Sequence, residues 1–121
     1  LAAQPAVHTA VSEAETLLHS AKTFLLDSVE KIWLSISAGE SVGTRPRALL
    51  RIAATHTAIS CARVAYLMYN AGGSSSLYTS CPLQRCFRDA HAVTQHVVVS
   101  PPTKELAGRV LLGLDTDTSM L

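Results

Sequence analysis

Residues 71–96 read AGGSSSLYTSCPLQRCFRDAHAVTQH, and this stretch contains signals for the end of one helix and the start of the next. The pair Gly72 and Gly73 ends the apolar segment before it, since glycine commonly closes a helix. Pro82 begins the next segment, because a missing backbone N–H costs nothing in a first helical turn. The stretch predicts two helices joined by a glycine–serine loop, the second running from Pro82 to about Val98.

The second of these helices carries a concentration of polar chemistry. At about 100° per residue, Arg85, Asp89 and His96 fall on one stripe and the apolar residues fall on the opposite stripe. Arg85 and Asp89 are four residues apart and are expected to pair. The stripe is either a solvated helix face or part of a binding site. The preceding loop favours a site, because Gly72 and Gly73 allow backbone N–H groups to turn outward and the serines add hydroxyl donors.

Two long segments precede the loop. Apolar residues recur at spacings of three and four over residues 11–36 and 44–70, which predicts two amphipathic helices. Ser12 with Glu15 three residues later is a capping-box pattern and predicts the start of the first helix. Thr44 is the expected N-cap of the second helix, which is rich in small residues.

The end of the chain predicts one more helix and a tail. Pro101 and Pro102 prevent the third helix from continuing, and Thr103 is expected to cap a short helix over residues 104–112. The chain is long enough for one domain, and its many alanines and leucines with few aromatics favour helices over strands. The fold class is therefore predicted as all-α, an antiparallel helical bundle over residues 1–114 with a flexible tail over residues 115–121.

Charge is unevenly distributed along the chain. Residues 42–98 contain six arginines against Asp89 alone, a net charge of +5, whereas residues 1–41 carry −3. Arginine suits carboxylates and phosphates, so this excess indicates an anionic ligand or an acidic neighbouring subunit. Pairing with the acidic first helix is an equally good explanation. A nucleic-acid partner is not expected, because lysine clusters and interleaved aromatics are missing.

The cysteines and the hydropathy pattern indicate the expected cellular compartment. The three cysteines are not spaced as metal or redox motifs, so no metal site is expected and a cytoplasmic protein with reduced thiols is predicted. No apolar run approaches the roughly 20 residues of a membrane span. The sequence begins with Leu1 rather than Met, and we expect it to be a fragment of a longer protein.

Four segments of the sequence form one recognisable pattern: residues 69–78 (YNAGGSSSLY), 80–90 (SCPLQRCFRDA), 95–96 (QH) and 108–113 (GRVLLG). Together they resemble the C-terminal domain of the acyl-CoA dehydrogenase superfamily, in the type shared with two-component flavin-dependent monooxygenases. The resemblance implies a bundle at the core of a homo-oligomer, a dimer or tetramer, that contacts FAD or FMN. It also implies N-terminal and β-barrel domains, a first bundle helix that this chain lacks, and a flavin reductase as a partner.

The resemblance also implies roles for individual residues. Gly72, Gly73, Ser74 and Ser75 match the loop that approaches the flavin, often in a neighbouring subunit, and Arg85 belongs to the family's Arg-x-x-Arg-Asp signature. His96 matches the histidine that lies near the flavin ring and assists oxygen activation in the monooxygenase branch. A hydrogen-bond donor at this position is consistent with such a role.

One departure from the dehydrogenase pattern favours the monooxygenase branch. Acyl-CoA dehydrogenases commonly place a catalytic glutamate one residue after the position of His96, and Val97 stands there in this chain. A dehydrogenase-like enzyme that removes hydrogen from a CH–CH bond would need its base elsewhere. The other alternative is a helical oligomerisation module without catalytic function, in which the small residues of the second helix would build a subunit interface.

Overall fold

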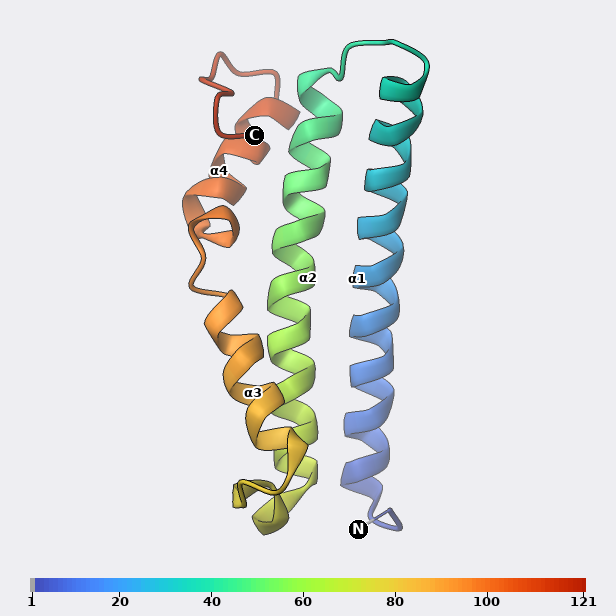
Figure 1. Cartoon of the computed structure of the whole chain (residues 1–121), viewed down its shortest axis with the longest axis vertical. Helices are drawn as coiled ribbons and strands as arrows, with labels where there is room; N and C mark the ends of the chain where they lie inside the picture. Colours follow the sequence, from blue (N-terminus) through green and yellow to red (C-terminus); the bar gives the residue numbers. More distant parts are fainter. Residues whose placement is uncertain (1) are drawn as a thin grey trace.

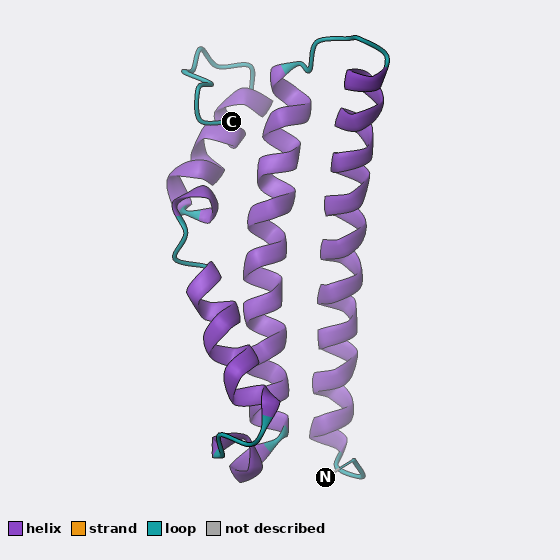
Figure 2. Cartoon of the chain, viewed as in Figure 1, coloured by secondary structure: helices purple, strands orange, loops and turns teal. Residues whose placement is uncertain are grey.

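The computed structural model describes residues 2–121 and contains four α-helices and two short 3₁₀ helices (Figure 2). The α-helices are α1 (Pro5–Ser37), α2 (Thr44–Ala71), α3 (Pro82–Val93) and α4 (Pro101–Leu111), and the 3₁₀ helices are η1 (Gly73–Leu77) and η2 (Val97–Val99). Within residues 2–121 there is no strand, so the all-α prediction is confirmed. No helix in this range is long and apolar enough to cross a membrane.

The helices form three antiparallel columns (Figure 1). α2 lies in the centre and packs against α1 on one side and against α3 and α4 on the other. α3 and α4 follow one another along α2 in the same direction and together replace one long helix. Over the described residues the backbone of α1 runs close to α2 but not to α3 or α4, so the three columns do not close around a central core.

The enclosed positions are occupied by small residues. The Thr57 hydroxyl on α2 donates to the Ala21 carbonyl oxygen on α1 at 3.4 Å, which shows how closely the two helices approach. No large apolar side chain in residues 2–121 is buried, and the buried residues are Ala14, Ala21, Ser28, Ala48, Ala53, Thr55, Ala58, Ser60, Ala62, Ser76 and Ala107. Close packing of small residues therefore aligns the helices, while the large apolar side chains remain partly or fully accessible.

Large apolar residues lie along α1 beside the face that contacts α2. We define the α1 stripe as Val11, Leu18, Leu25, Val29 and Ile36, which recur at spacings of seven and four and so share one side of the helix. All but the half-buried Leu25 are exposed, and Ile36 keeps 56% of its surface accessible. Such a contiguous apolar surface is typical of an interface with another protein segment.

The start of α1 corrects the predicted capping box. The helix begins at Pro5 after the N-cap residue Gln4, not at Ser12. Ser12 lies inside the helix, where its carbonyl oxygen accepts a hydrogen bond from the Thr16 hydroxyl at 2.9 Å. Pro5 supplies the same kind of start signal as Pro82, because its fixed φ suits the first helical turn.

The boundaries of α3 and α4 also differ from the predicted ones. α3 ends at Val93 instead of about Val98, and Thr94 closes it by donating its hydroxyl proton to the His91 carbonyl oxygen at 2.7 Å. α4 begins at Pro101, two residues before the predicted cap Thr103. Pro101 and Pro102 thus occupy the first turn of α4, where prolines are tolerated. They also prevent the preceding helical segment from continuing into α4.

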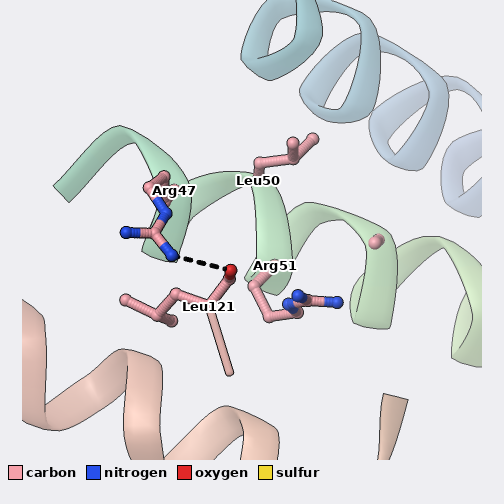
Figure 3. A pocket seen from close by; sticks show the side chains of 5 residues that line it. Arg47, Leu50, Arg51 and Leu121 are labelled. Atoms are coloured by element: carbon pink, nitrogen blue, oxygen red, sulfur yellow. Dashed lines mark hydrogen bonds between the residues drawn. The ribbon is translucent and has the colours of Figure 1, made fainter. Parts of the chain in front are cut away.

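The tail over residues 115–121 folds back onto α2 and α4. Arg47 donates to the main-chain oxygens of Thr118 and Leu121 at 3.2 and 3.1 Å (the bond to Leu121 is shown in Figure 3), and Arg109 donates to the Asp115 carbonyl oxygen at 3.0 Å. The Ser119 N–H donates to Asp117 and holds the pKa of that carboxyl below its usual value. This contact therefore favours the folded tail above the ordinary carboxyl pKa and is lost as the pH falls. The flexibility of residues 115–121 stays a prediction.

Candidate functional site

Two glycines shape the loop after α2, one by its lack of a side chain and the other by its backbone conformation. Gly72 caps α2 in a right-handed helical conformation, and a Cβ atom there would collide with the Ser76 hydroxyl and lie 3.0 Å from Leu83 Cδ1. Gly73 has φ +58°, the left-handed region that favours glycine, and open space surrounds it. Gly72 therefore permits close packing, while Gly73 permits the turn and leaves the backbone beside it accessible.

The three serines of the loop do not have the same environment. Ser74 and Ser75 are exposed, and neither hydroxyl makes a hydrogen bond with any part of residues 2–121. Ser76 is fully buried, and its hydroxyl oxygen has no hydrogen-bond partner in the described chain. The hydroxyl groups available to a ligand are therefore those of Ser74 and Ser75, whereas Ser76 packs inward against Gly72.

Replacing Gly72 with alanine is expected to destabilise the protein by about 1 to 3 kcal/mol, because the new methyl group overpacks the contact with Ser76 and Leu83. Ser76→Ala in the same chain should recover part of this loss, since it removes both the collision and an unpaired buried hydroxyl. Gly73→Ala is the matched control: it strains φ but meets no neighbour, so Ser76→Ala should not rescue it. Urea denaturation of the full-length protein measures all four variants. If Ser76→Ala changed the stability of the Gly72→Ala and Gly73→Ala variants by the same amount, this packing would be contradicted.

Arg85 lies in the first turn of α3 and forms the expected pair with Asp89. The Arg85 Nε to Asp89 Oδ2 distance is 3.3 Å, and the two side chains are 81% and 64% exposed. A pair this exposed contributes only about 0.2 to 1 kcal/mol, so its main effect is to orient the guanidinium group. Most of the Arg85 hydrogen-bonding capacity remains available to an anion.

His96 does not lie on α3, which corrects the continuous helical stripe predicted from the sequence. It follows the helix in an extended conformation and caps η2, where its Nδ1 accepts a hydrogen bond from the Val98 N–H at 3.2 Å. Because Nδ1 is the acceptor, the proton of the neutral ring is on Nε2. The exposed His96 ring therefore presents an N–H donor away from its own backbone.

The glycine–serine loop precedes α3 and His96 follows it, so the two groups lie at opposite ends of this helix. α3 has 12 residues, and at a rise of about 1.5 Å per residue it separates the two groups by roughly 18 Å. Arg85 lies near the loop end of this helix. The chain therefore arranges its candidate residues along one column and does not bring them into one pocket.

The structure pairs only one of the arginines of residues 42–98 with the acidic first helix. Arg63 on α2 pairs with Glu13 on α1 at 3.0 Å, as the pairing alternative predicts. In the described chain Arg45, Arg51 and Arg88 form no ion pair with an acidic side chain, and Arg47 bonds main-chain oxygens of the tail. The contact of Arg47 with the tail and the burial of Ser76 both depend on distant packing, which no local sequence pattern indicates.

Comparisons with known proteins agree with the resemblance found in the sequence. A family model described as "Acyl-CoA dehydrogenase, C-terminal domain" matches residues 1–101. Two proteins named indole-3-acetate monooxygenase are similar to the chain. The one from Pseudomonas putida is 36% identical over 93% of this chain and 29% of its own length. The one from Acinetobacter baumannii is 30% identical over 94% of this chain and 29% of its own length.

A solved structure shares the arrangement of the helices. The 3-HSA hydroxylase from Rhodococcus sp. RHA1 superposes with a TM-score of 0.90 at 26% identity, over 98% of this chain and 32% of the hydroxylase. The chain thus spans about 30% of the length of the relatives it matches. Since the family model covers most of its residues, the chain belongs to the C-terminal domain family of the acyl-CoA dehydrogenases.

Proposed function

We propose that the chain is the C-terminal helical part of a flavin-dependent monooxygenase. The observation that carries this proposal is the similarity of almost the whole chain to proteins named monooxygenase or hydroxylase. The sequence around His96 agrees with it, since η2 (Val97–Val99) stands where a dehydrogenase commonly has its catalytic glutamate. A dehydrogenase-like reaction with a base elsewhere is the second candidate, and it rests on the family match alone.

The residues present suit a flavin, either FAD or FMN. Ser74 and Ser75 have free hydroxyl groups, and the space around Gly73 is open, so a polar part of the cofactor can approach the loop backbone. Arg85 is available for an anionic group such as phosphate. When bound, reduced flavin supplies the electrons that activate dioxygen for transfer of one oxygen atom to the substrate.

His96 is the proposed catalytic residue. Its Nε2–H donor is directed by the hydrogen bond that Nδ1 accepts from Val98, so the ring does not need to reorient to donate. A fixed donor of this kind stabilises negative charge that develops on a nearby oxygen atom. In this proposal the loop and His96 contact different parts of a flavin or different flavins of the assembly, because α3 keeps them apart.

The proposed assembly is a cytoplasmic homo-oligomer, a dimer or tetramer, whose subunits also contain N-terminal and β-barrel domains. The α1 stripe supports it, because these side chains need a covering that α2, α3 and α4 do not provide. The open face between α1, α2 and α4 has a hollow of about 510 Å³ with Phe24, Ile52 and Ile59 in its lining, which also needs a neighbour. A separate flavin reductase is the proposed source of reduced flavin.

Oxygen transfer tests the proposed function. We expect the full-length enzyme, supplied with reduced flavin, to incorporate one oxygen atom from ¹⁸O₂ into each product molecule, as a monooxygenase does. Indole-3-acetate is the first substrate to examine, because two relatives carry it in their names. Mass spectrometry of the product measures the incorporation.

A further inference from the structure

A row of three rings lies between α2 and α3, directly before the segment that carries His96. The Tyr69 ring of α2 lies 4.9 Å from the Phe87 ring of α3, and the Phe87 ring lies 4.2 Å from the His91 ring, measured between ring centroids. We call Tyr69, Phe87 and His91 the ring stack. Tilted ring pairs of this kind stabilise a contact beyond the apolar area that they bury. The ring stack therefore attaches the C-terminal half of α3 to α2.

The His91 ring is held by a hydrogen bond as well as by stacking. Its Nδ1 lies 2.7 Å from the Phe87 carbonyl oxygen. Because a carbonyl oxygen can only accept, Nδ1 carries the proton and donates. The ring is half-buried and lies in the last turn of α3. Two contacts with the same neighbouring residue thus fix the orientation of the His91 ring.

A tight turn connects His91 with His96. The Thr94 N–H and the Thr94 hydroxyl both donate to the His91 carbonyl oxygen, at 3.2 and 2.7 Å. The next two N–H groups, the second of which belongs to His96, repeat this three-residue spacing at 3.1 Å each. Successive bonds of this spacing form a tight 3₁₀-type turn, which leaves the chain little freedom. The His96 ring then accepts the bond from the Val98 N–H, so its direction depends on where this turn begins.

From these contacts we infer that His91 is a positioning residue for His96. The ring stack fixes the end of α3, and the turn that follows sets the direction of the His96 Nε2–H donor. The inference rests on the proposed function, since a directed donor matters for the reaction only if His96 meets a reacting oxygen atom. His91 does not itself supply a second Nδ1–H donor, because Phe87 accepts that hydrogen bond. If the His91 ring only adds packing, its loss lowers stability without a selective effect at His96.

Hydrogen–deuterium exchange of the full-length enzyme tests the positioning without any turnover. The Val98 N–H reports on His96, because it is the group that donates to Nδ1. We expect His91→Ala to accelerate exchange at this N–H by about three- to tenfold, since losing one ring contact lets the end of α3 open more often. His91→Phe should stay within about twofold of the unchanged enzyme, because its ring can still stack on Phe87. Unchanged Val98 exchange in His91→Ala would overturn the inference.

Two further variants separate the ring stack from general loosening of α3. Tyr69→Leu leaves His91 in place but removes the outer ring, so it should also accelerate Val98 exchange, and it tests the inference even if His91→Ala folds poorly. Cys86 is exposed on α3 and is not part of the ring stack, so Cys86→Ala should leave Val98 exchange unchanged. Equal acceleration by all three substitutions would overturn the inference.

The ratio of hydroxylated product to hydrogen peroxide distinguishes a positioning role from a merely structural one. We expect His91→Ala to lower this ratio by about three- to tenfold, because a displaced donor stabilises charge less well, and His91→Phe to keep it near that of the unchanged enzyme. In a His96→Ala enzyme, His91→Ala should cause no further loss, since its effect passes through His96. An unchanged ratio in folded His91→Ala, or an equal further loss in the double variant, would overturn the inference. If the unchanged enzyme transfers no oxygen, the proposed function fails, while Val98 exchange still decides whether His91 positions His96.

Discussion

Replacing His96 with alanine in the full-length enzyme is expected to lower product formation by about 10- to 100-fold, with reduced flavin still oxidised. The reason is the fixed Nε2–H donor: the Val98 N–H bonds to Nδ1 and leaves only Nε2 to donate. Without this donor, negative charge on the activated oxygen loses stabilisation, and reducing equivalents are diverted to hydrogen peroxide. Simultaneous assays of hydroxylated product and hydrogen peroxide measure the ratio between the two outcomes.

A second histidine provides the control for this prediction. His19 is exposed on α1 and its imidazole ring makes no hydrogen bond within the described residues, so His19→Ala should leave the product-to-peroxide ratio unchanged. His96→Gln should retain part of the activity, because its side-chain amide can still donate. An unchanged ratio in a well-folded His96→Ala enzyme would contradict the role proposed for this residue.

Placing a charge in the α1 stripe is expected to weaken assembly of the enzyme. Leu18 is 40% exposed in the single chain and lies between Val11 and Leu25 in the stripe. If a second copy covers this surface, Leu18→Glu puts an unpaired carboxylate into the interface. Such burial costs several kcal/mol, which corresponds to a roughly 100-fold or greater increase in the dissociation constant. Sedimentation velocity at a series of enzyme concentrations measures this change.

The control for assembly lies on another face of the same helix. Thr23 is exposed and is outside the stripe by its position in the helical repeat, so Thr23→Glu should keep the original oligomer. Far-ultraviolet circular dichroism should show equal helical content for both variants, because neither position is enclosed by α2. A Leu18→Glu enzyme that sediments as the unchanged protein would show that no subunit covers this surface.

The glycines and prolines explain why most helix boundaries were predictable. Gly39 and Gly113 adopt positive φ values one residue after the C-cap residues of α1 and α4, and Gly72 caps α2, so a glycine in the sequence indicates where each of these helices ends. Prolines were more ambiguous, since Pro101 both follows a helical segment and begins α4. A local pattern also misled: the Ser12 and Glu15 spacing fits a capping box, but α1 continues through it because Pro5 starts the helix earlier.

The candidate site was only partly predictable for a related reason. The types of residue in the loop and at position 96 indicated a ligand, and the pairing of Arg85 with Asp89 follows from their spacing and is confirmed. The end of α3 at Val93 depends on hydrogen bonds that involve the side chains of Thr94 and His96. The spacing of apolar residues in the sequence does not predict such bonds. The open arrangement of the three columns depends on which helices meet in space, so sequence patterns did not reveal it.

The isotopic content of the product formed by the full-length enzyme distinguishes monooxygenase from dehydrogenase chemistry most directly. Under ¹⁸O₂ in ordinary water, with reduced flavin supplied, a monooxygenase product gains one ¹⁸O atom, and the reversed labelling with H₂¹⁸O leaves it unlabelled. We expect this pair of results for indole-3-acetate or another substrate that the enzyme accepts. A product that has lost two hydrogen atoms and gained no oxygen, formed without dioxygen in the presence of an electron acceptor, would contradict it and establish dehydrogenase chemistry.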